Sequence, residues 1–303
     1  MKIENKFPGK DVSHEDMKSK FPLVAKKNDT HKSKFEIAGV EFGGDLIPVF
    51  AGPNMVESKD LIEDVAINVK KLGAHFLRGG AFKPLTFPYR SEKYNETREK
   101  GIEWLVSAKE KAGIPIITEV MEEGYVSLIA EASDILQIGT RNMQNFPLLT
   151  ACAKTGKPIL LKRGYGASLR DWLGAAEYIL VEGNEKVILC ERGVSVAHTH
   201  RSTSRFLLDL QVIPAAQELT HLPIASDPSH ATFWRPWVKP MSLASVASGA
   251  DAIMLEVHPD PDNSAVDPLQ PINYFDFNKL INKMDSVARA SYDRYVINRN
   301  KSG

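Results

Sequence analysis

Short apolar runs alternate with amphipathic segments along most of the chain, starting near Leu46. A short apolar run is typical of a strand buried on both faces of a parallel sheet, whereas apolar residues at helical spacing indicate a helix that packs on such a sheet. The pattern predicts a series of strands at residues 47–52, 75–78, 115–120, 134–138, 158–162, 186–190, 223–226 and 252–257.

Helical segments lie between these runs, and two of them carry boundary signals. In residues 58–72 the apolar side chains share one face, and Ser58 and Gly73 are suited to cap the two ends. In a later segment, Ser168 and Asp171 resemble a capping box. Strand–helix repeats over about 240 residues match the size of a (β/α)8 TIM barrel. A doubly wound sheet is the second possibility, but the segment after the first strand lacks the glycine-rich dinucleotide fingerprint of that fold.

The beginning of the chain differs in composition from the rest. Residues 1–34 are polar and rich in lysine, so we expect a polar N-terminal arm. In residues 34–44, apolar and polar residues alternate on both sides of a glycine, which predicts a short β-hairpin. The expected fold is therefore α/β, with residues 35–303 forming a single (β/α)8 barrel domain behind an N-terminal extension.

Composition and charge narrow the classes of function. Of 303 residues, 43% are hydrophobic, and 38 Lys plus Arg balance 38 Asp plus Glu. A net charge of zero gives no overall attraction to nucleic acid or to a membrane, so neither is expected as a partner. No apolar run approaches the roughly 20 residues that span a bilayer, and there is no signal-peptide core, so we expect a cytoplasmic protein. Cys152 and Cys190 are expected to be reduced and buried.

Polar side chains collect at the carboxyl ends of the predicted strands, where barrel enzymes build their sites. Five cations come from five different loops: Arg78, Lys83, Arg141, Lys162 and Arg192. Their convergence at one end of a neutral protein would indicate a polyanionic small ligand, because Arg makes bidentate contacts to phosphate or carboxylate and Lys supplies a point charge. The alternative is that these cations pair with acidic strand-end neighbours, namely Glu119, Glu191 and Glu256.

A second group of strand-end residues has the composition of a metal site. His230, Glu256 and Asp267 provide one imidazole and two carboxylates, which suit a divalent ion such as manganese or iron. His230 ends the sequence DPSH, a turn-like segment directly after a strand. A purely structural histidine is the alternative, because the spacing does not reveal a fourth ligand.

Six strings in the same order resemble the 3-deoxy-D-arabino-heptulosonate 7-phosphate (DAHP) synthases of the short class, which are similar to the 3-deoxy-octulosonate 8-phosphate (KDO8P) synthases. The strings are LRGGAFKP (77–84), QIGTRN (137–142), LLKRG (160–164), ILCERG (188–193), DPSHAT (227–232) and EVHPDP (256–261). The resemblance implies a barrel transferase that condenses phosphoenolpyruvate with a phosphorylated aldose, erythrose 4-phosphate first of all, and releases inorganic phosphate. It further implies a homodimer or homotetramer that serves the shikimate pathway of aromatic amino acid biosynthesis.

The same resemblance implies roles for individual residues. The residues that would bind the substrates are Arg78, Lys83, Thr86, Arg141, Lys162, Arg192 and Arg205. Lys83, Lys162 and His230 would be catalytic. The implied metal ligands are His230, Glu256 and Asp267.

The chain departs from the family pattern on the metal and acceptor side. Asn54 stands where the family has a metal-binding cysteine, which predicts a manganese-like divalent metal that is weakly bound or not required. Leu85 replaces an arginine of the aldose loop, and Phe206 replaces an asparagine beside Arg205. A DAHP synthase remains the main prediction. The alternatives are an enzyme that uses another aldose, as KDO8P synthases do, and a non-catalytic paralogue that binds a phosphorylated ligand.

Overall fold

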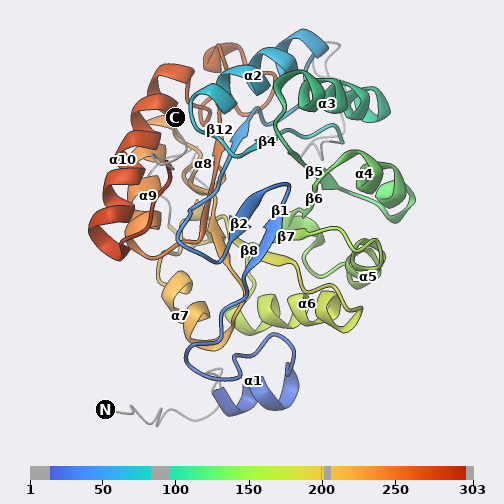
Figure 1. Cartoon of the computed structure of the whole chain (residues 1–303), viewed down its shortest axis with the longest axis vertical. Helices are drawn as coiled ribbons and strands as arrows, with labels where there is room; N and C mark the ends of the chain where they lie inside the picture. Colours follow the sequence, from blue (N-terminus) through green and yellow to red (C-terminus); the bar gives the residue numbers. More distant parts are fainter. Residues whose placement is uncertain (1–13, 83–95, 199, 201–205, 298–303) are drawn as a thin grey trace.

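The computed structural model describes residues 14–82, 96–198, 200 and 206–297. Eight parallel strands form a closed barrel, in which β12 pairs with β3 and β8 pairs with β11 to complete the ring (Figure 1). The strands are β3 (Val49–Gly52), β4 (Phe76–Arg78), β5 (Ile116–Val120), β6 (Ile135–Ile138), β7 (Ile159–Lys162), β8 (Val187–Glu191), β11 (Ile224–Ser226) and β12 (Ala252–Glu256). The predicted (β/α)8 barrel is confirmed, and each predicted strand overlaps one of these eight.

Helices surround the barrel on its outside (Figure 1). The long helices are α2 (Lys59–Lys71), α3 (Arg98–Ala112), α4 (Val126–Ala132), α5 (Phe146–Lys154), α6 (Leu169–Val181), α7 (Val212–Leu219), α9 (Arg235–Ala247) and α10 (Tyr274–Tyr292). Short helical turns are α8 (Pro228–Thr232), η2 (Glu123–Tyr125), η3 (Thr140–Asn142) and η4 (Pro261–Asn263), and a small sheet pairs β9 (Val194–Ser195) with β10 (Phe206–Leu207). The apolar faces of the long helices pack on the barrel strands and form the main hydrophobic core.

Local sequence signals set the ends of two helices as predicted. The Ser58 hydroxyl accepts a hydrogen bond from the Leu61 backbone N–H at 3.2 Å, so it caps α2. At the other end of α2, Gly73 has a φ of +105° and lies one residue beyond the capping position. Ser168 and Asp171 form a capping box at the start of α6, with reciprocal hydrogen bonds of 3.1 and 3.0 Å.

The inside of the barrel is filled by apolar side chains and closed at one end by a hairpin. The hairpin pairs β1 (Phe35–Ile37) with β2 (Val40–Phe42) in antiparallel register, which confirms the hairpin prediction. It crosses the amino ends of the barrel strands (Figure 1). The Phe42 ring lies 6.0 Å from the Phe50 ring and 5.7 Å from the Phe76 ring, measured between centroids. The hairpin therefore contributes to the same core as the inward-facing strand residues.

Two expectations drawn from composition can be compared with the described residues. Cys152 and Cys190 are both buried and form no disulfide, as predicted. No described helix combines the length and the apolar composition that crossing a membrane would need.

The described part of the predicted N-terminal arm packs against the barrel. It contains α1 (His14–Lys20), and Met17 and Val24 are fully buried. The Glu177 carboxylate on α6 accepts hydrogen bonds from the backbone N–H groups of Leu23 at 3.0 Å and Val24 at 2.7 Å. This part is therefore attached to the outer helices, while the division of the chain into an arm and a barrel domain stays a prediction.

Replacing Glu177 with alanine tests this attachment. The Glu177→Ala variant leaves two backbone N–H groups without their acceptor, so we expect the free energy of unfolding to fall by about 1–3 kcal/mol. Urea denaturation measures this change. Limited trypsin digestion should also cut the variant faster after Lys26 and Lys27. The control is Glu182→Ala, which removes an exposed carboxylate at the end of the same helix and should behave like the wild type. Equal stability of Glu177→Ala and wild type would contradict the attachment.

Candidate active site

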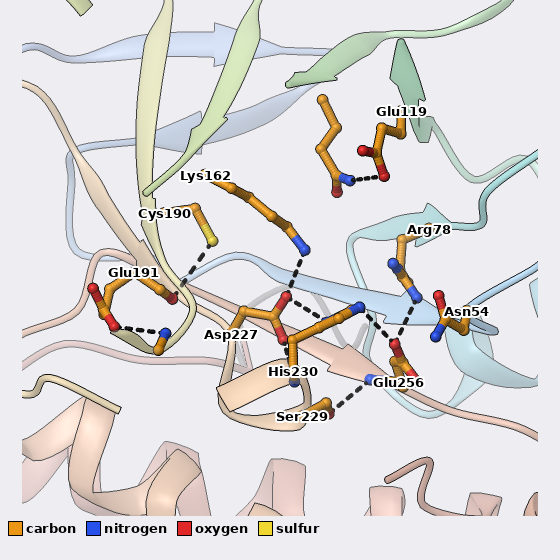
Figure 2. Close-up of polar contacts among 12 residues, drawn as sticks. Asn54, Arg78, Glu119, Lys162, Cys190, Glu191, Asp227, Ser229, His230 and Glu256 are labelled. Carbon is orange, nitrogen blue, oxygen red and sulfur yellow. Dashed lines mark hydrogen bonds and ion pairs between the residues drawn. The ribbon is translucent and has the colours of Figure 1, made fainter. Parts of the chain in front are cut away.

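Charged side chains gather at the carboxyl ends of the barrel strands. Arg78 is the last residue of β4, Lys162 of β7, Glu191 of β8 and Glu256 of β12, and Arg192 directly follows β8. Because the strands are parallel, these positions lie at the same end of the barrel. Figure 2 shows side chains from β4, β7 and β12 directed toward one another. This end of the barrel is the candidate active site.

The short helix α8 adds a histidine to this cluster. Asp227 follows β11 directly and caps α8, since its Oδ1 accepts a hydrogen bond from the His230 backbone N–H at 3.1 Å. Pro228 occupies the first turn, where a missing N–H costs nothing. The Ser229 hydroxyl accepts a hydrogen bond from the Glu256 backbone N–H at 3.0 Å. The sequence DPSH therefore fixes His230 between the ends of β11 and β12.

A continuous line of buried ionisable side chains in contact runs across this end of the barrel (Figure 2). Lys162 Nζ lies 2.7 Å from Asp227 Oδ2, which in turn lies 2.8 Å from His230 Nδ1. His230 Nδ1 makes no hydrogen bond of good geometry among the described residues. His230 Nε2 lies 2.9 Å from Glu256 Oε1, and the same oxygen lies 3.4 Å from Arg78 Nη1. We call these five residues the charge line.

Asp227 carries the negative charge at the Lys162 end of the charge line. Its burial raises its pKa, but the neighbouring His230 and Lys162 outweigh that effect and hold the pKa well below the usual value. Two predicted ligand-binding cations, Arg78 and Lys162, are thus paired with carboxylates. Glu256 is a partner that the sequence had suggested, whereas Asp227 was missed. Its position as an N-cap directly after a strand was the available signal.

Arg192 differs from the other buried cations because it contacts no carboxylate in the described part of the chain. Its side chain is about 5% exposed, and its Nε and Nη1 have no hydrogen-bond partner among the described residues. Its guanidinium carbon lies 4.9 Å from the Tyr165 ring centroid and 4.4 Å from that of Phe206. Burial lowers the pKa of Arg192, but an arginine keeps its charge in proteins. Buried, charged N–H groups without an acceptor are suited to bind an anion.

Arg163 was not predicted as a site residue, although it directly follows Lys162. Its Nη1 lies 3.0 Å from Glu191 Oε2 and 2.8 Å from Asp209 Oδ2, and its Nε donates to the Ala167 carbonyl at 3.0 Å. Successive side chains of an extended segment point to opposite sides. The string LLKRG therefore supplies one cation to the charge line and one to the loops around β8. The acid that pairs with Arg163 was visible in the neighbouring string ILCERG.

Four predicted substrate-binding residues remain. Arg141 lies in η3 and is exposed. Lys83, Thr86 and Arg205 lie outside the described residues, and so does Leu85. Of the five predicted cations, Arg78, Lys162 and Arg192 are buried at this barrel end, and Arg141, which follows β6, is exposed at the same end.

A small pocket lies beside Arg78. Its lining residues are Asn54, Arg78, Gly79, Gly80, Ile117, Thr118, Glu119 and Gln137. Arg78 Nη1 donates to the Pro53 carbonyl at 2.9 Å, while its Nε is buried without a hydrogen-bond partner among the described residues. Gln137 Nε2 donates to Glu119 Oε2 at 3.2 Å. The pocket thus offers a charged donor next to an amide and a carboxylate.

The predicted metal ligands do not form a metal site among the described residues. His230 and Glu256 contact each other directly, and the Asn54 amide donates a hydrogen bond from Nδ2 to Asp267 Oδ2 at 2.9 Å. No group of three or more His, Cys, Asp or Glu side chains in the described ranges is spaced to bind a metal ion. An amide N–H directed at Asp267 presents a donor, not a ligand, to that space. This arrangement does not fit a divalent ion.

Comparison with known proteins identifies the family. The model of the DAHP synthetase I family matches residues 22–290. The chain belongs to the DAHP synthetase I family. It is 38% identical to phospho-2-dehydro-3-deoxyheptonate aldolase of Thermotoga maritima, over 89% of this chain and 78% of that protein. A 2-dehydro-3-deoxyphosphooctonate aldolase of Desulfotalea psychrophila is 28% identical, over 82% of this chain and 91% of that protein.

Solved structures of the DAHP synthetase I family agree with the fold described above. The crystal structure of the Thermotoga maritima DAHP synthase superposes with a TM-score of 0.82 at 38% identity, covering 88% of this chain and 77% of that one. A truncated form of the Thermotoga maritima enzyme gives a TM-score of 0.81 at 37% identity, over 89% and 97% of the two chains. The family resemblance seen in the six sequence strings is confirmed.

Replacing Arg163 with methionine tests the ion pair that supports the loop after β8. Glu191 is fully buried and would lose its cation, so we expect the free energy of unfolding at neutral pH to fall by about 3–5 kcal/mol. Burial raises the pKa of Glu191 already, and the loss of Arg163 raises it further. Because the pKa of Glu191 is higher in the folded state, the folded protein binds more protons than the unfolded chain. The free energy of unfolding therefore falls as pH rises. Arg163→Met should therefore lose more stability than wild type between about pH 5 and pH 8.

The comparison needs two further variants, all measured by urea denaturation. The double variant Arg163→Met/Glu191→Gln removes both charges and should recover part of the loss and the wild-type pH dependence. Lys154→Met, an exposed change on α5, should leave stability unchanged. If Arg163→Met were as stable as wild type, the ion pair would have no part in the stability of this loop.

Proposed function

We propose that this protein condenses phosphoenolpyruvate with erythrose 4-phosphate and releases inorganic phosphate. The observation that carries the proposal is Arg192, a buried cation with N–H groups that lack an acceptor among the described residues. It lies at the carboxyl end of a barrel that is 38% identical to a phospho-2-dehydro-3-deoxyheptonate aldolase. The product would be a seven-carbon 3-deoxy-2-keto acid phosphate, so the protein would be a transferase of the shikimate pathway.

The described cations suit phosphoenolpyruvate, which carries a phosphate and a carboxylate. Arg192 offers two free N–H positions to one of these groups, and Arg78 offers its buried Nε. Lys162 has three N–H donors and uses one on Asp227, so two remain for a ligand. The carboxylates of the charge line fix the positions of Arg78 and Lys162 before the substrate arrives. Such preorganised charge lowers the cost of bringing two anionic substrates together.

The chemistry follows from the placement of Lys162. Carbon 3 of phosphoenolpyruvate attacks the aldehyde carbon, a C–C bond forms, and the aldehyde oxygen takes a proton from the Lys162 ammonium. Water adds to carbon 2 of the former enol phosphate, and the C–O bond to phosphate breaks so that phosphate leaves with the bonding electrons. This water loses two protons as carbon 2 becomes a ketone: one restores the Lys162 ammonium, and the other goes to the departing phosphate. Asp227 orients Lys162 through their ion pair, and His230 contacts the same Asp227 oxygen from the other side.

The identity of the acceptor is supported by the comparisons. The phospho-2-dehydro-3-deoxyheptonate aldolase is 38% identical to this chain, and the 2-dehydro-3-deoxyphosphooctonate aldolase of Desulfotalea psychrophila 28%. This difference favours the seven-carbon product over the eight-carbon one. The homodimer or homotetramer implied by the family and the cytoplasmic location stay predictions.

We propose further that the condensation does not require a divalent metal. The support comes from Asn54, which stands at the position of the family's cysteine and donates a hydrogen bond to Asp267. An amide is a weaker ligand than a thiolate for manganese-like ions. Glu256, the second carboxylate of the predicted ligand set, is occupied by His230 and Arg78.

The activity is tested by phosphate release from phosphoenolpyruvate in the presence of erythrose 4-phosphate. We expect turnover by the wild type, and for Arg192→Gln a decrease of about 100-fold in kcat/KM for phosphoenolpyruvate, because charge-assisted hydrogen bonds contribute about 1.5–3 kcal/mol each. Arg192→Lys keeps the charge but loses the planar donors and should lie between the two. Lys186→Gln, an exposed change before β8 at the other barrel end, should retain activity.

The same assay with arabinose 5-phosphate separates the alternatives. Faster turnover with this aldose would contradict the proposed acceptor while leaving the reaction class in place. Binding of phosphoenolpyruvate by calorimetry without turnover on any aldose phosphate would show a non-catalytic paralogue.

The metal proposal is tested with a chelator. Protein treated with EDTA should keep its kcat within about twofold, and added manganese should not raise it, because no step relies on a metal-bound group. Asn54→Cys restores a thiolate ligand, so this variant should bind manganese more tightly in calorimetry than the wild type. A more than tenfold loss of wild-type activity in EDTA, reversed by manganese, would contradict the proposal.

A further inference from the structure

A cavity of about 450 Å³ lies at the amino ends of the barrel strands, opposite the candidate active site. Asp251 directly precedes β12 and Leu222 closely precedes β11, and both line this cavity. Other walls come from the N-terminal segment, from the glycines after β2 and from the residues around the end of α10. We call it the amino-end cavity. Its volume is in the range of small-molecule sites.

The amino-end cavity carries an excess of positive charge. Its charged lining residues are Lys26, Lys32, Lys34, Asp45, Asp251 and Arg294. Buried Asp251 is neutralised, since Lys32 Nζ lies 2.8 Å from its Oδ1 and Arg294 Nη2 lies 3.2 Å from the same oxygen. Lys26 and Lys34 form no ion pair with any carboxylate among the described residues. Four cations thus face two carboxylates, which leaves about two positive charges to be balanced by a ligand or by solvent ions.

Arg294 provides the second observation that indicates a ligand. This side chain is about 8% exposed, and its Nη1 donates to the Ala250 carbonyl at 3.2 Å. Its Nε is buried without a hydrogen-bond partner among the described residues, while its Nη2 lies against the Asp251 carboxylate. Buried guanidinium N–H groups without acceptors are uncommon, and an oxyanion is their best partner.

His221 also lines the amino-end cavity, and both of its ring nitrogens contact the N-terminal segment. One ring nitrogen, Nε2, lies 2.8 Å from the Leu23 carbonyl, and the other, Nδ1, lies 2.6 Å from the Ser33 hydroxyl. Burial lowers the pKa of His221, so the imidazole is neutral at physiological pH and adds no charge. The positive charge of the cavity therefore comes from the lysines and from Arg294.

We propose that the amino-end cavity is a binding site for a small phosphorylated molecule, separate from the active site. A phosphate dianion matches the two unbalanced positive charges, and its oxygens would accept from Arg294, Lys26 and Lys34. The cavity is larger than a phosphate ion, so the rest of a sugar-sized molecule fits beside the glycines after β2. Because Lys26 and Lys34 belong to the N-terminal segment, the bound anion would also join that segment to the barrel.

Isothermal calorimetry with inorganic phosphate and with glycerol 3-phosphate tests this site in the full chain. The active site also binds phosphate if the proposed function is correct, so two single-site variants separate the two locations. We expect the double variant Lys26→Gln/Lys34→Gln to lose at least tenfold in affinity at one site and to keep the other. Arg192→Gln should show the reverse. Tighter binding of glycerol 3-phosphate than of phosphate at the amino-end cavity is expected, because the cavity has room for the glycerol.

The control is Lys27→Gln, which removes an exposed charge from the same segment outside the cavity lining. Lys27→Gln should bind both ligands like the wild type. Each ligand should raise the melting temperatures of wild type and Lys27→Gln by the same amount, and the melting temperature of the double variant by less. Unchanged phosphate binding in Lys26→Gln/Lys34→Gln would overturn the proposal. So would an equal loss in Lys27→Gln, which would show general surface charge, or binding of malonate as tight as that of phosphate. None of these results depends on catalytic turnover.

Discussion

The buried pairing of Lys162 with Asp227 is the interaction on which the active-site end of the barrel depends. Both side chains are nearly inaccessible to water, so each charge is tolerable only because the other lies 2.7 Å away. His230 and Glu256 extend the pairing to Arg78, and the line thereby connects the ends of β4, β7, β11 and β12. Removing one member would leave an uncompensated charge in a dry environment. The same contacts therefore determine both the geometry of the site and the stability of the strand ends.

Most of the fold could be predicted from the sequence because its signals are local. An apolar run such as residues 158–162 is buried on both faces, and a residue such as Ser58 caps a helix wherever that helix packs. The N-terminal segment shows the limit of such reasoning. It is polar on average, yet Met17 and Val24 are buried, and its contacts include a carboxylate more than 150 positions away in the chain. Composition does not reveal contacts of this kind.

The sequence predicted which residues lie at the site better than it predicted which of them contact one another. Arg78, Lys162 and Arg192 were expected because cations at strand ends converge in a parallel barrel. Whether a cation is free or paired depends on distances across the barrel, and the sequence contains none of these. Lys162 and Arg163 are neighbours in the sequence, yet Lys162 joins the charge line and Arg163 binds Glu191. Arg192 alone among the three expected cations contacts two aromatic rings in place of an acid, in the part of the chain that the structure describes.

The hairpin of β1 and β2 closes the barrel at the amino ends of its strands. Phe42 packs against Phe50 and Phe76, so aromatic rings fill the lumen at one end. Reactants and products have to enter and leave through the opposite rim, and nothing small passes along the axis between that rim and the amino-end cavity. Any coupling between ligand binding at the two ends must therefore act through displacements of the barrel strands, and not by diffusion of a ligand through the lumen.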